Sequence, residues 1–360
     1  MKRILFLSAS TGGGHNSIGM ALKRALGRYK DIRFVIMDFF EEGNPKLNKL
    51  VTGFYSVSTK RFPWLYGFLY YITNKKMVWK GISSLKYPKL KENISHYIGQ
   101  MKPDMIISAH PLVNKITADI IEQMCLKIPF VIVVGDPVTY HASWIEPRAD
   151  LVIVGSETAK KRFASHGVEE NKIKVVGVPI DPRFYEKPTP KTIAREMYGI
   201  DQNKFTILLL GGGEGAGKIS SIAKKLVREN LPINIVVVSG KNKKMMHQLS
   251  KYPIRVFGYT QEMHHIMDAV DLVVTKAGPS TIEECTAKNL PMIITSYLPG
   301  QEKGNIAYAK SKTKAHYVTK EKKVIQIIKK YIVTEKKRKQ LRIVNPPVLQ
   351  IASMIRSYLK

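Results

Sequence analysis

The fold of this chain is decided by its first residues, Lys2-Arg3-Ile4-Leu5-Phe6-Leu7-Ser8-Ala9-Ser10-Thr11-Gly12-Gly13-Gly14-His15-Asn16. The apolar run Ile4–Leu7 ends in a glycine-rich turn, and a helical pattern begins directly after it. A glycine turn between a buried strand and a helix lets a ligand approach the backbone and exposes helix N–H groups to an anion. The second half repeats this arrangement, with Ile207–Leu210 followed by Gly211–Gly217. The pattern predicts two α/β domains that face each other across a cleft.

Short apolar runs alternate with helix-length segments along the chain. Most of these runs are rich in Ile and Val and lack polar alternation, which is typical of strands buried on both faces of a parallel sheet. We expect strands at Ile4–Leu7, Phe34–Met37, Met105–Ser108, Phe130–Val134, Leu151–Val154, Lys174–Val176, Thr206–Leu210, Ile233–Val238, Arg255–Phe257, Leu272–Thr275, Met292–Thr295 and Ala315–Val318.

Proline density and lost periodicity between Val178 and Pro190 indicate an interdomain linker. We therefore expect an N-terminal domain over residues 1–178 and a C-terminal domain over residues 179–345. Residues 346–360 have the pattern of an amphipathic helix that packs back on the N-terminal domain.

The composition is that of a strongly basic globular protein. Lysine and arginine total 58 against 28 acidic residues, which gives a formal net charge of +30. Such a charge indicates an anionic partner, either nucleic acid or an acidic membrane surface. The two cysteines, Cys125 and Cys285, fall in different halves, so they build neither a disulfide framework nor a zinc site.

The glycine turn of the second half has three interpretations. Gly212–Lys218 matches the start of a P-loop, but Ile219 stands where that motif needs Ser or Thr for magnesium. The same turn fits a loose dinucleotide fingerprint. A tight turn without a ligand is the third interpretation. The segment that decides among them lies further along the chain.

That segment is Thr275–Glu284, which follows another apolar strand. Gly278 and Pro279 shape a turn, and Ser280 and Thr281 offer hydroxyls and backbone N–H groups at a helix start, which suits a diphosphate. A carboxylate one helical turn later can accept hydrogen bonds from ribose hydroxyls. The alternative is a capping box, in which these hydroxyls and the following glutamates only terminate the helix.

A third polar cluster follows the next strand. The sequence Tyr297-Leu298-Pro299-Gly300-Gln301-Glu302-Lys303-Gly304-Asn305 crowds amides and carboxylates into one short turn. Such groups hydrogen-bond the hydroxyls of a sugar in fixed directions. A solvated loop explains any one of them, but explains the whole cluster poorly.

In combination these motifs are similar to one family. The Gly-Gly-Gly-His turn, Gly211–Gly217, Lys276–Glu284 and Pro299-Gly300-Gln301-Glu302-x-Gly-Asn305 resemble the monogalactosyldiacylglycerol synthase and processive diacylglycerol glucosyltransferase group of glycosyltransferase family 28. The resemblance covers nearly the whole chain, in order. It implies an α/β GT-B fold, a UDP-hexose donor and inverting transfer to diacylglycerol, with no metal or other cofactor. The choice between glucose and galactose stays open, as does another lipid acceptor such as a polyprenyl-linked sugar.

The resemblance also implies roles for single residues. The diphosphate would meet Ser280 and Thr281, and the ribose would meet Glu284. The sugar would meet Gln301, Glu302 and Asn305, and the backbone around Phe257-Gly258-Tyr259 would hold the uracil. The donor-binding set is completed by Gly212, Gly213 and Gly278.

Inverting transfer needs a base for the acceptor hydroxyl and stabilisation of the departing UDP. We expect His15 to be the base, because a helix N-terminus lowers a histidine pKa and keeps the ring neutral; a purely structural hydrogen bond is the alternative. Asp136 is the competing base, although the Gly135-Asp136-Pro137 stretch departs from the family's Thr-Asp-Phe-like pattern. The other acceptor-side candidates are Gly14, Asn16, His110 and His141.

Residues 53–80 interleave aromatic and basic side chains. The expected membrane contacts are Trp64, Tyr66, Phe68, Lys60, Arg61, Lys75 and Lys76. Aromatic rings would enter the interface while the cations meet anionic headgroups, which predicts a peripheral protein on the cytoplasmic face of the cell membrane. The alternative is that the aromatic side chains form core beneath a lid.

Two other classes of protein share some of these features. The charge alone suggests a nucleic-acid-binding protein, but no groove-reading or single-strand-binding module is present, so no nucleic acid is expected. A catalytically inactive sugar-nucleotide sensor is the other class, and the presence of both His15 and Glu284 argues against it.

Overall fold

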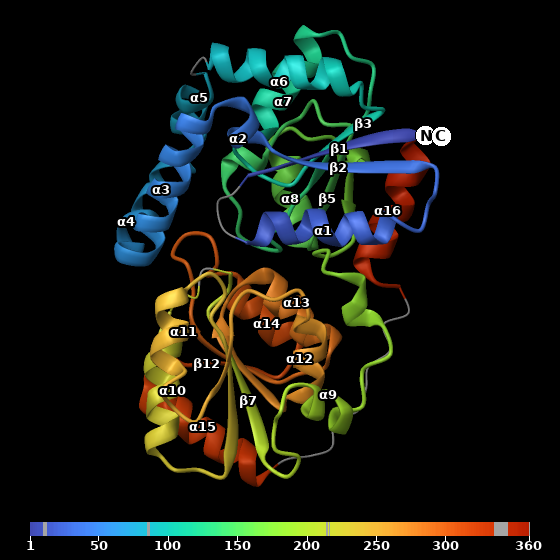
Figure 1. Cartoon of the computed structure of the whole chain (residues 1–360). Helices are drawn as coiled ribbons and strands as arrows, with labels where there is room; N and C mark the ends of the chain where they lie inside the picture. The colour runs from blue at the N-terminus through green and yellow to red at the C-terminus, as the bar shows by residue number, and fades with distance from the viewer. Residues whose placement is uncertain (10–12, 85–86, 214, 216, 335–344, 360) are drawn as a thin grey trace. The chain divides into compact units, whose positions relative to one another are not determined.

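The structure is a computed structural model that describes residues 1–9, 13–84, 87–213, 215, 217–334 and 345–359, without the side chains of Lys60 and Lys76. The chain forms two compact units (Figure 1). The first comprises Met1–Pro182, Leu298–Gln301 and Asn345–Lys360, and the second comprises Arg183–Tyr297 and Glu302–Val344. The division falls a few residues after the expected boundary at residue 178, within the proline-rich linker.

The first unit is built on a six-stranded sheet in the order β2-β1-β3-β4-β5-β6, with every neighbouring pair parallel. Its strands are β1 (Lys2–Ser8), β2 (Ile32–Asp38), β3 (Met105–Ser108), β4 (Phe130–Val133), β5 (Leu151–Val154) and β6 (Ile173–Val175). The three central strands β3, β4 and β5 are buried along their whole length. This explains their unbroken apolar sequences, since helices cover both faces of a parallel sheet.

The helices of the first unit are α1 (Gly14–Leu26), α2 (Phe39–Gly43), α3 (Pro45–Arg61), α4 (Pro63–Thr73), α5 (Lys76–Ser83), α6 (Pro88–Met101), α7 (Asn114–Gln123), α8 (Glu157–Ser165) and α16 (Pro347–Tyr358). The unit also contains the short 3-10 helices η1 (Ala142–Trp144) and η2 (Glu170–Lys172); another, η3 (Pro182–Tyr185), begins at the last residue of its first segment and continues into the second unit. The C-terminal helix α16 buries Val348, Ile351 and Ile355, and it lies against α1 (Figure 1). The Arg356 guanidinium stacks 4.1 Å above the ring of Tyr29.

The second unit repeats the architecture. Its six strands are parallel and ordered β12-β11-β10-β7-β8-β9. They are β7 (Phe205–Leu210), β8 (Ile233–Val238), β9 (Arg255–Phe257), β10 (Leu272–Lys276), β11 (Met292–Ser296) and β12 (Ala315–Tyr317). The helices are α9 (Lys191–Met197), α10 (Ile219–Arg228), α11 (Lys243–Leu249), α12 (Met263–Ala269), α13 (Pro279–Ala287), α14 (Asn305–Lys312) and α15 (Glu321–Val333).

All twelve expected strands are therefore present, with ends that shift by at most two residues. The expectation of an α/β fold with two Rossmann-like domains is confirmed. In both sheets the first strand in sequence is central, and the chain order reverses beside it: between β1 and β3 in the first unit, and between β7 and β10 in the second. Open parallel sheets bind ligands beyond the carboxyl ends of their strands at such points of reversal.

Candidate active site

The point of reversal in the second unit brings together two of the segments singled out in the sequence. Leu210 and Thr275 are register partners at the carboxyl ends of β7 and β10. The glycine turn after β7 and the Lys276–Glu284 segment after β10 therefore begin side by side. The neighbouring strand β11 ends beside β10, where Lys276 pairs with Ser296, and the third polar cluster follows it.

The turn after β7 closely approaches the chain at β10. Gly212 has a φ of +67°, a conformation that favours glycine, and a Cβ added there would lie 3.0 Å from Cε of Lys276. A Cβ added to Gly278 would lie 3.6 Å from Nζ of Lys276 and 3.9 Å from Oγ1 of Thr281. Two glycines, a lysine ammonium and a hydroxyl thus converge at the start of α13. That combination suits a diphosphate, since both charge and hydrogen-bond donors point to one place.

Lys276 also forms an ion pair with the carboxylate of Glu302. The lysine side chain is 26% exposed and the glutamate side chain is 5% exposed. The pair joins the segment expected to meet the diphosphate to the cluster expected to meet the sugar. The sequence alone assigned no role to Lys276. Its position could have indicated one, because a basic side chain at the carboxyl end of a strand, shortly before a Gly-Pro turn, is well placed to bind an anion.

The hydroxyls of Ser280 and Thr281, in the first turn of α13, do not cap this helix. The helix is capped by Gly278, which has no side chain to form a cap, and it begins at Pro279. Ser280 and Thr281 therefore lie inside the helix instead of capping it, and the capping-box alternative is wrong for this segment. Both hydroxyl residues and Glu284 are partly exposed.

Asn305, expected to meet the sugar, has a protein partner in this structure. It is completely buried at the start of α14, and its side-chain amide donates to the Ala277 carbonyl over 3.0 Å. In this structure it therefore stabilises the turn between β10 and α13.

Of the residues expected around the uracil, Phe257 is partly buried at the end of β9 and Tyr259 is 65% exposed. The carbonyl of Gly213 accepts a hydrogen bond from the Lys241 amide over 2.9 Å.

In the first unit the reversal between β1 and β3 brings two histidines together. Leu7 and Ser108 are register partners at the carboxyl ends of these strands, so the turns that carry His15 and His110 are neighbours. The two rings meet edge to face with centroids 4.6 Å apart. His15 stands in the first turn of α1, directly after Gly14, which is exposed.

Hydrogen bonds define which nitrogen of each ring carries the proton. Nδ1 of His15 lies 2.6 Å from the Ala109 carbonyl, which only accepts, so Nδ1 is protonated and Nε2 has the free lone pair. Burial lowers the pKa of His15 to about 4, although this hydrogen bond opposes the shift. His110 accepts from the Leu112 amide at Nδ1, and burial together with His15 lowers its pKa well below the usual value. His15 therefore has the properties of a neutral base.

Asp136, the competing base, is buried in the same unit, and Trp144 connects it to His15. The indole Nε1 of Trp144 donates to Oδ2 of Asp136 over 3.3 Å, and the ring of Trp144 lies 6.0 Å from that of His15. The amide of Gln301, in the short segment grouped with the first unit, donates to both oxygens of Asp136 over 3.1 and 3.2 Å. Donors from Trp144 and Gln301 therefore engage both oxygens of the Asp136 carboxylate. Gln301, expected to meet the sugar, binds this carboxylate in the present structure.

The remaining acceptor-side candidates, Asn16 and His141, form hydrogen bonds between separate elements of the first unit. Asn16 accepts a hydrogen bond from the Ser8 hydroxyl over 2.5 Å, which ties α1 to the end of β1. His141 accepts from the Ser143 amide at Nδ1 over 3.1 Å, and its Nε2 lies 2.9 Å from the Thr73 hydroxyl. The His141 ring thereby joins helix α4 to the short helix that carries Trp144. Burial, with Arg162 nearby, lowers the pKa of His141 to about 4.

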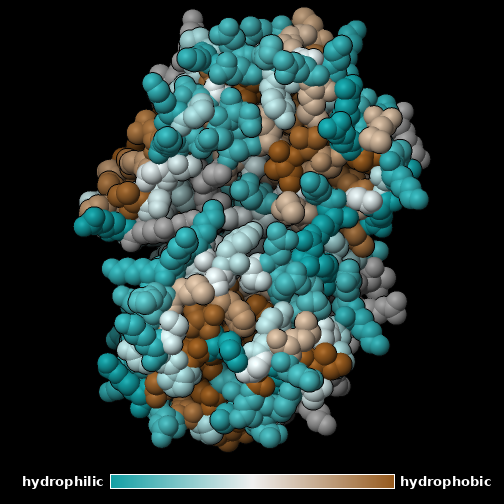
Figure 2. Space-filling view, in the orientation of Figure 1, coloured by the Kyte–Doolittle hydropathy of each residue, from teal (hydrophilic) through white to brown (hydrophobic). Residues whose placement is uncertain are grey.

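Helices α3 to α5 expose an apolar surface, which we call the aromatic face. Figure 2 shows hydrophobic atoms gathered over these helices at the upper left. Helix α4 has no buried residue. The aromatic face comprises Leu50, Phe54, Val57, Phe62, Trp64, Phe68, Tyr71 and Met77, which are between 42% and 88% exposed.

Tyr66 does not belong to the aromatic face. It is only partly exposed, and its hydroxyl donates to Oε1 of Gln301 over 3.1 Å. Of the expected basic contacts, Arg61 and Lys75 are exposed. The side chains of Lys60 and Lys76 lie outside what the structure describes. No helix among the described residues has the length and apolar character to cross a bilayer.

Comparison with known proteins matches both units. The monogalactosyldiacylglycerol (MGDG) synthase family profile matches residues 15–180, and the glycosyltransferase family 28 C-terminal domain matches residues 206–345. Monogalactosyldiacylglycerol synthase 3 of Arabidopsis thaliana is 33% identical, over 86% of this chain and 69% of its own length. The spinach (Spinacia oleracea) monogalactosyldiacylglycerol synthase is 30% identical, over 92% of this chain and 66% of its own length. The chain thus spans about two thirds of these relatives.

A solved structure supports the fold. The crystal structure of MurG from Acinetobacter baumannii superposes with a TM-score of 0.57 and covers 99% of this chain and 100% of its own. The two sequences are 15% identical, so the likeness concerns the fold alone. Together with the two parallel sheets, it confirms the expected GT-B fold.

Proposed function

Because the chain belongs to the monogalactosyldiacylglycerol synthase group of family 28 glycosyltransferases, we propose that it moves a hexose from a UDP-sugar to diacylglycerol, with inversion, at a membrane surface. The second unit binds the donor and the first unit activates the acceptor hydroxyl. The observation that carries the proposal is the convergence of Gly212, Lys276, Gly278 and Thr281 at the reversal of the second sheet, next to the Glu302 carboxylate.

In the donor unit, the diphosphate lies at the first turn of α13. The backbone N–H groups of this turn, the Thr281 hydroxyl and the Lys276 ammonium stabilise the negative charge that develops on departing UDP. Glu284, one helical turn further, accepts from the ribose hydroxyls. These protein groups supply the leaving-group stabilisation that a metal provides in other transferases.

In the acceptor unit, Nε2 of His15 takes the proton from the attacking hydroxyl. The Ala109 carbonyl holds the ring in the tautomer that leaves Nε2 unprotonated. Asp136 has its oxygens engaged by Trp144 and Gln301, which suits a role in positioning the Trp144 ring that contacts His15. The His15–Trp144 ring contact keeps these groups in one cluster.

The aromatic face provides membrane docking. Trp64, Phe68 and Tyr71 recur at helical spacing along α4, and Leu50, Phe54 and Val57 do the same along α3. Residues 43–91 contain ten lysines and arginines and no aspartate or glutamate. Apolar rings insert into the interface, while the basic residues are attracted to anionic headgroups. The protein then acts as a peripheral enzyme on the cytoplasmic face of the cell membrane.

One experiment tests the whole proposal. The purified protein is incubated with anionic vesicles that contain diacylglycerol, and with UDP-glucose or UDP-galactose in parallel reactions. Mass spectrometry identifies the glycolipid, and NMR of the anomeric proton distinguishes β from α linkage. A β-linked hexosyl-diacylglycerol formed equally well after dialysis against EDTA supports the proposal. Loss of turnover in EDTA, at a temperature where the chelator-treated protein is still folded by circular dichroism, contradicts the metal-free mechanism. Transfer only to a polyprenyl-linked acceptor overturns the choice of substrate.

A further inference from the structure

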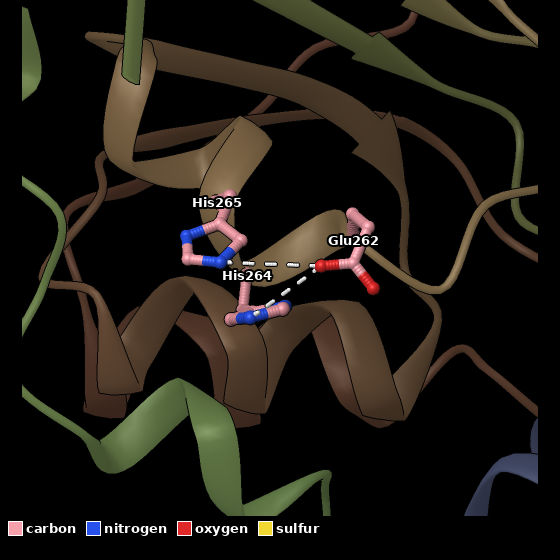
Figure 3. A group of neighbouring side chains, drawn as sticks. All are labelled: Glu262, His264 and His265. Atoms are coloured by element: carbon pink, nitrogen blue, oxygen red, sulfur yellow. Dashed lines mark ion pairs between the residues drawn. The ribbon is translucent and has the colours of Figure 1, made fainter. Parts of the chain in front are cut away.

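A cluster of potential metal ligands lies in the second unit, apart from the residues assigned to the donor. Figure 3 shows Glu262, His264 and His265 at the start of α12, with both imidazole rings directed toward the glutamate carboxylate. Nε2 of each histidine lies 3.9 Å from Oε2 of Glu262. One nitrogen or oxygen atom from each of the three residues lies within 4.8 Å of the other two.

The surrounding contacts orient this cluster. The Thr189 hydroxyl lies 2.7 Å from Nδ1 of His265, which leaves Nε2 of that ring for a metal. Thr189 is itself held, because its backbone N–H donates to Asp268 over 3.0 Å and Asp268 forms a buried ion pair with Lys288. A metal-binding histidine is typically oriented in this way, by a hydrogen bond to its other ring nitrogen.

The other two residues are held as well. Arg183 donates to Oε1 of Glu262 over 3.1 Å, and the facing oxygen Oε2 is the one that lies near the rings. His264 is 5% exposed, packs 6.1 Å from the Phe184 ring, and stacks on His265 with centroids 4.0 Å apart. The buried histidine therefore has little freedom to turn away.

From this arrangement we propose that Glu262, His264 and His265 bind one divalent transition-metal ion of the zinc class. Two imidazole nitrogens and one carboxylate oxygen are ligands that zinc prefers, and they leave a fourth position for water. In a tetrahedral zinc site with bonds of about 2.0–2.1 Å, ligand atoms lie about 3.4 Å apart. The observed carboxylate–imidazole separations of 3.9 Å exceed that distance by about 0.5 Å, so metal binding requires the side chains to draw together. Magnesium is excluded by the two nitrogen ligands.

The site serves the fold of the second unit and not the transfer step. Its ligands belong to α12 and the preceding turn, while Thr189 and Arg183 belong to the segment that enters this unit. A bound ion links that segment to α12 through the Thr189–His265 hydrogen bond. Because a ligand that binds only the folded state stabilises it, zinc is expected to raise the melting temperature.

The test uses the full chain without an affinity tag, stripped of metal with a chelator. Zinc is titrated in competition with a chromogenic chelator, and cobalt(II) is added separately to record its visible absorption. We expect one zinc ion per chain with a dissociation constant of about 1 μM or tighter, a four-coordinate cobalt spectrum, and no response to magnesium. Zinc should also raise the melting temperature of the stripped protein.

The variants Glu262→Gln and His265→Gln each remove one ligand from the more accessible side of the cluster. Each should weaken zinc binding by at least about tenfold and abolish the zinc-dependent rise in melting temperature. Thr189→Val, which removes only the orienting hydroxyl, should weaken binding by about 10–100-fold. His247→Gln, which removes an exposed histidine in α11 of the same unit, is the matched control and should bind as the wild type does.

Melting of each variant without metal establishes that it folds. The inference is overturned if zinc binds only at millimolar concentration, or if His265→Gln binds zinc as tightly as His247→Gln. It is also overturned if cobalt bound to the wild-type protein shows only the weak spectrum of an octahedral aqua ion. Since none of these readouts involves transfer, they are independent of the proposed glycosyltransferase activity.

Discussion

Nδ1 of His15 donates to the backbone carbonyl of Ala109 over 2.6 Å, across 94 residues of sequence. The contact exists because β1 and β3 are neighbours, so the turn after each strand lies at the same edge of the sheet. A carbonyl cannot donate, and the proton must therefore reside on Nδ1. The opposite nitrogen, Nε2, is left as a base, and burial keeps the ring neutral at physiological pH.

Replacing His15 with alanine should reduce transfer by about 100-fold or more, the usual scale for a general base. Binding of UDP to the second unit should be unchanged in calorimetry, because that unit holds none of the acceptor-side residues. His96→Ala, at a residue on α6, is the control and should retain full turnover. If Asp136→Ala is the more severe change and His15→Ala keeps near-normal turnover, the base is Asp136.

The pH dependence of the reaction should report the same base. Protonation removes the lone pair of His15, so activity is lost as pH falls through the pKa of this ring. Because that pKa is lowered to about 4, kcat/KM should stay high at pH 5.5 and decline only near pH 4, well below the ordinary 6.5. A decline centred near pH 6.5 in steady-state kinetics would contradict a neutral His15 with a lowered pKa.

Lys276→Ala should weaken UDP-sugar binding and also lower stability. The variant leaves the Glu302 carboxylate buried without its cation, which costs about 1–3 kcal/mol in the free energy of unfolding. Adding Glu302→Gln should recover part of that stability, because the second change removes the uncompensated charge. Chemical denaturation of the two single variants and the double variant measures the coupling; strictly additive losses would mean that the ion pair contributes nothing.

Glu284→Ala should weaken UDP binding by about 1–3 kcal/mol, the scale of a lost hydrogen bond to a charged group. The carboxylate is partly exposed one turn into α13, so the substitution leaves the core intact. Glu229→Ala, at an exposed ion pair with Lys329 elsewhere in the unit, serves as the control and should bind UDP normally. Unchanged affinity of the Glu284 variant in calorimetry would remove the ribose assignment.

Membrane binding should separate into an electrostatic and an apolar contribution. Each exposed basic residue near the surface contributes attraction to anionic lipid of about 1 kcal/mol. Binding to phosphatidylglycerol vesicles should therefore fall steeply with salt, because screening shortens the reach of the charges. Vesicle sedimentation measures how binding depends on salt concentration and on lipid charge. Equal binding to neutral and anionic vesicles would contradict the electrostatic contribution.

The apolar contribution resides in the aromatic face. Trp64→Ala combined with Phe68→Ala should reduce transfer to membrane-embedded diacylglycerol while leaving UDP binding intact. The matched control is Ile193→Ala with Met197→Ala, which removes two exposed apolar side chains from α9 of the second unit. Full activity of the aromatic double variant on lipid acceptor would show that these rings do not insert.

The amino-acid sequence by itself determined the strands, the two-unit division and the family. Strands buried on both faces exclude polar residues for several positions in a row, so Ile106 and Ile107, or Val236 and Val237, can be assigned from the chain alone. Turns that begin helices likewise carry local signals in glycine and proline, as at Gly278 and Pro279. These properties depend on neighbours within a few residues.

Only the tertiary structure decided which side chains meet. Lys276 reaches Glu302 across 26 residues and Trp144 reaches Asp136 across eight, and neither pairing has a periodic signature in the sequence. The side-chain amide of Asn305 is of the kind that hydrogen-bonds a sugar. In the structure Asn305 is buried at the start of α14, and this amide donates to the Ala277 carbonyl. Contacts of this kind depend on strand order and register, which bring separate carboxyl ends to one edge of the sheet.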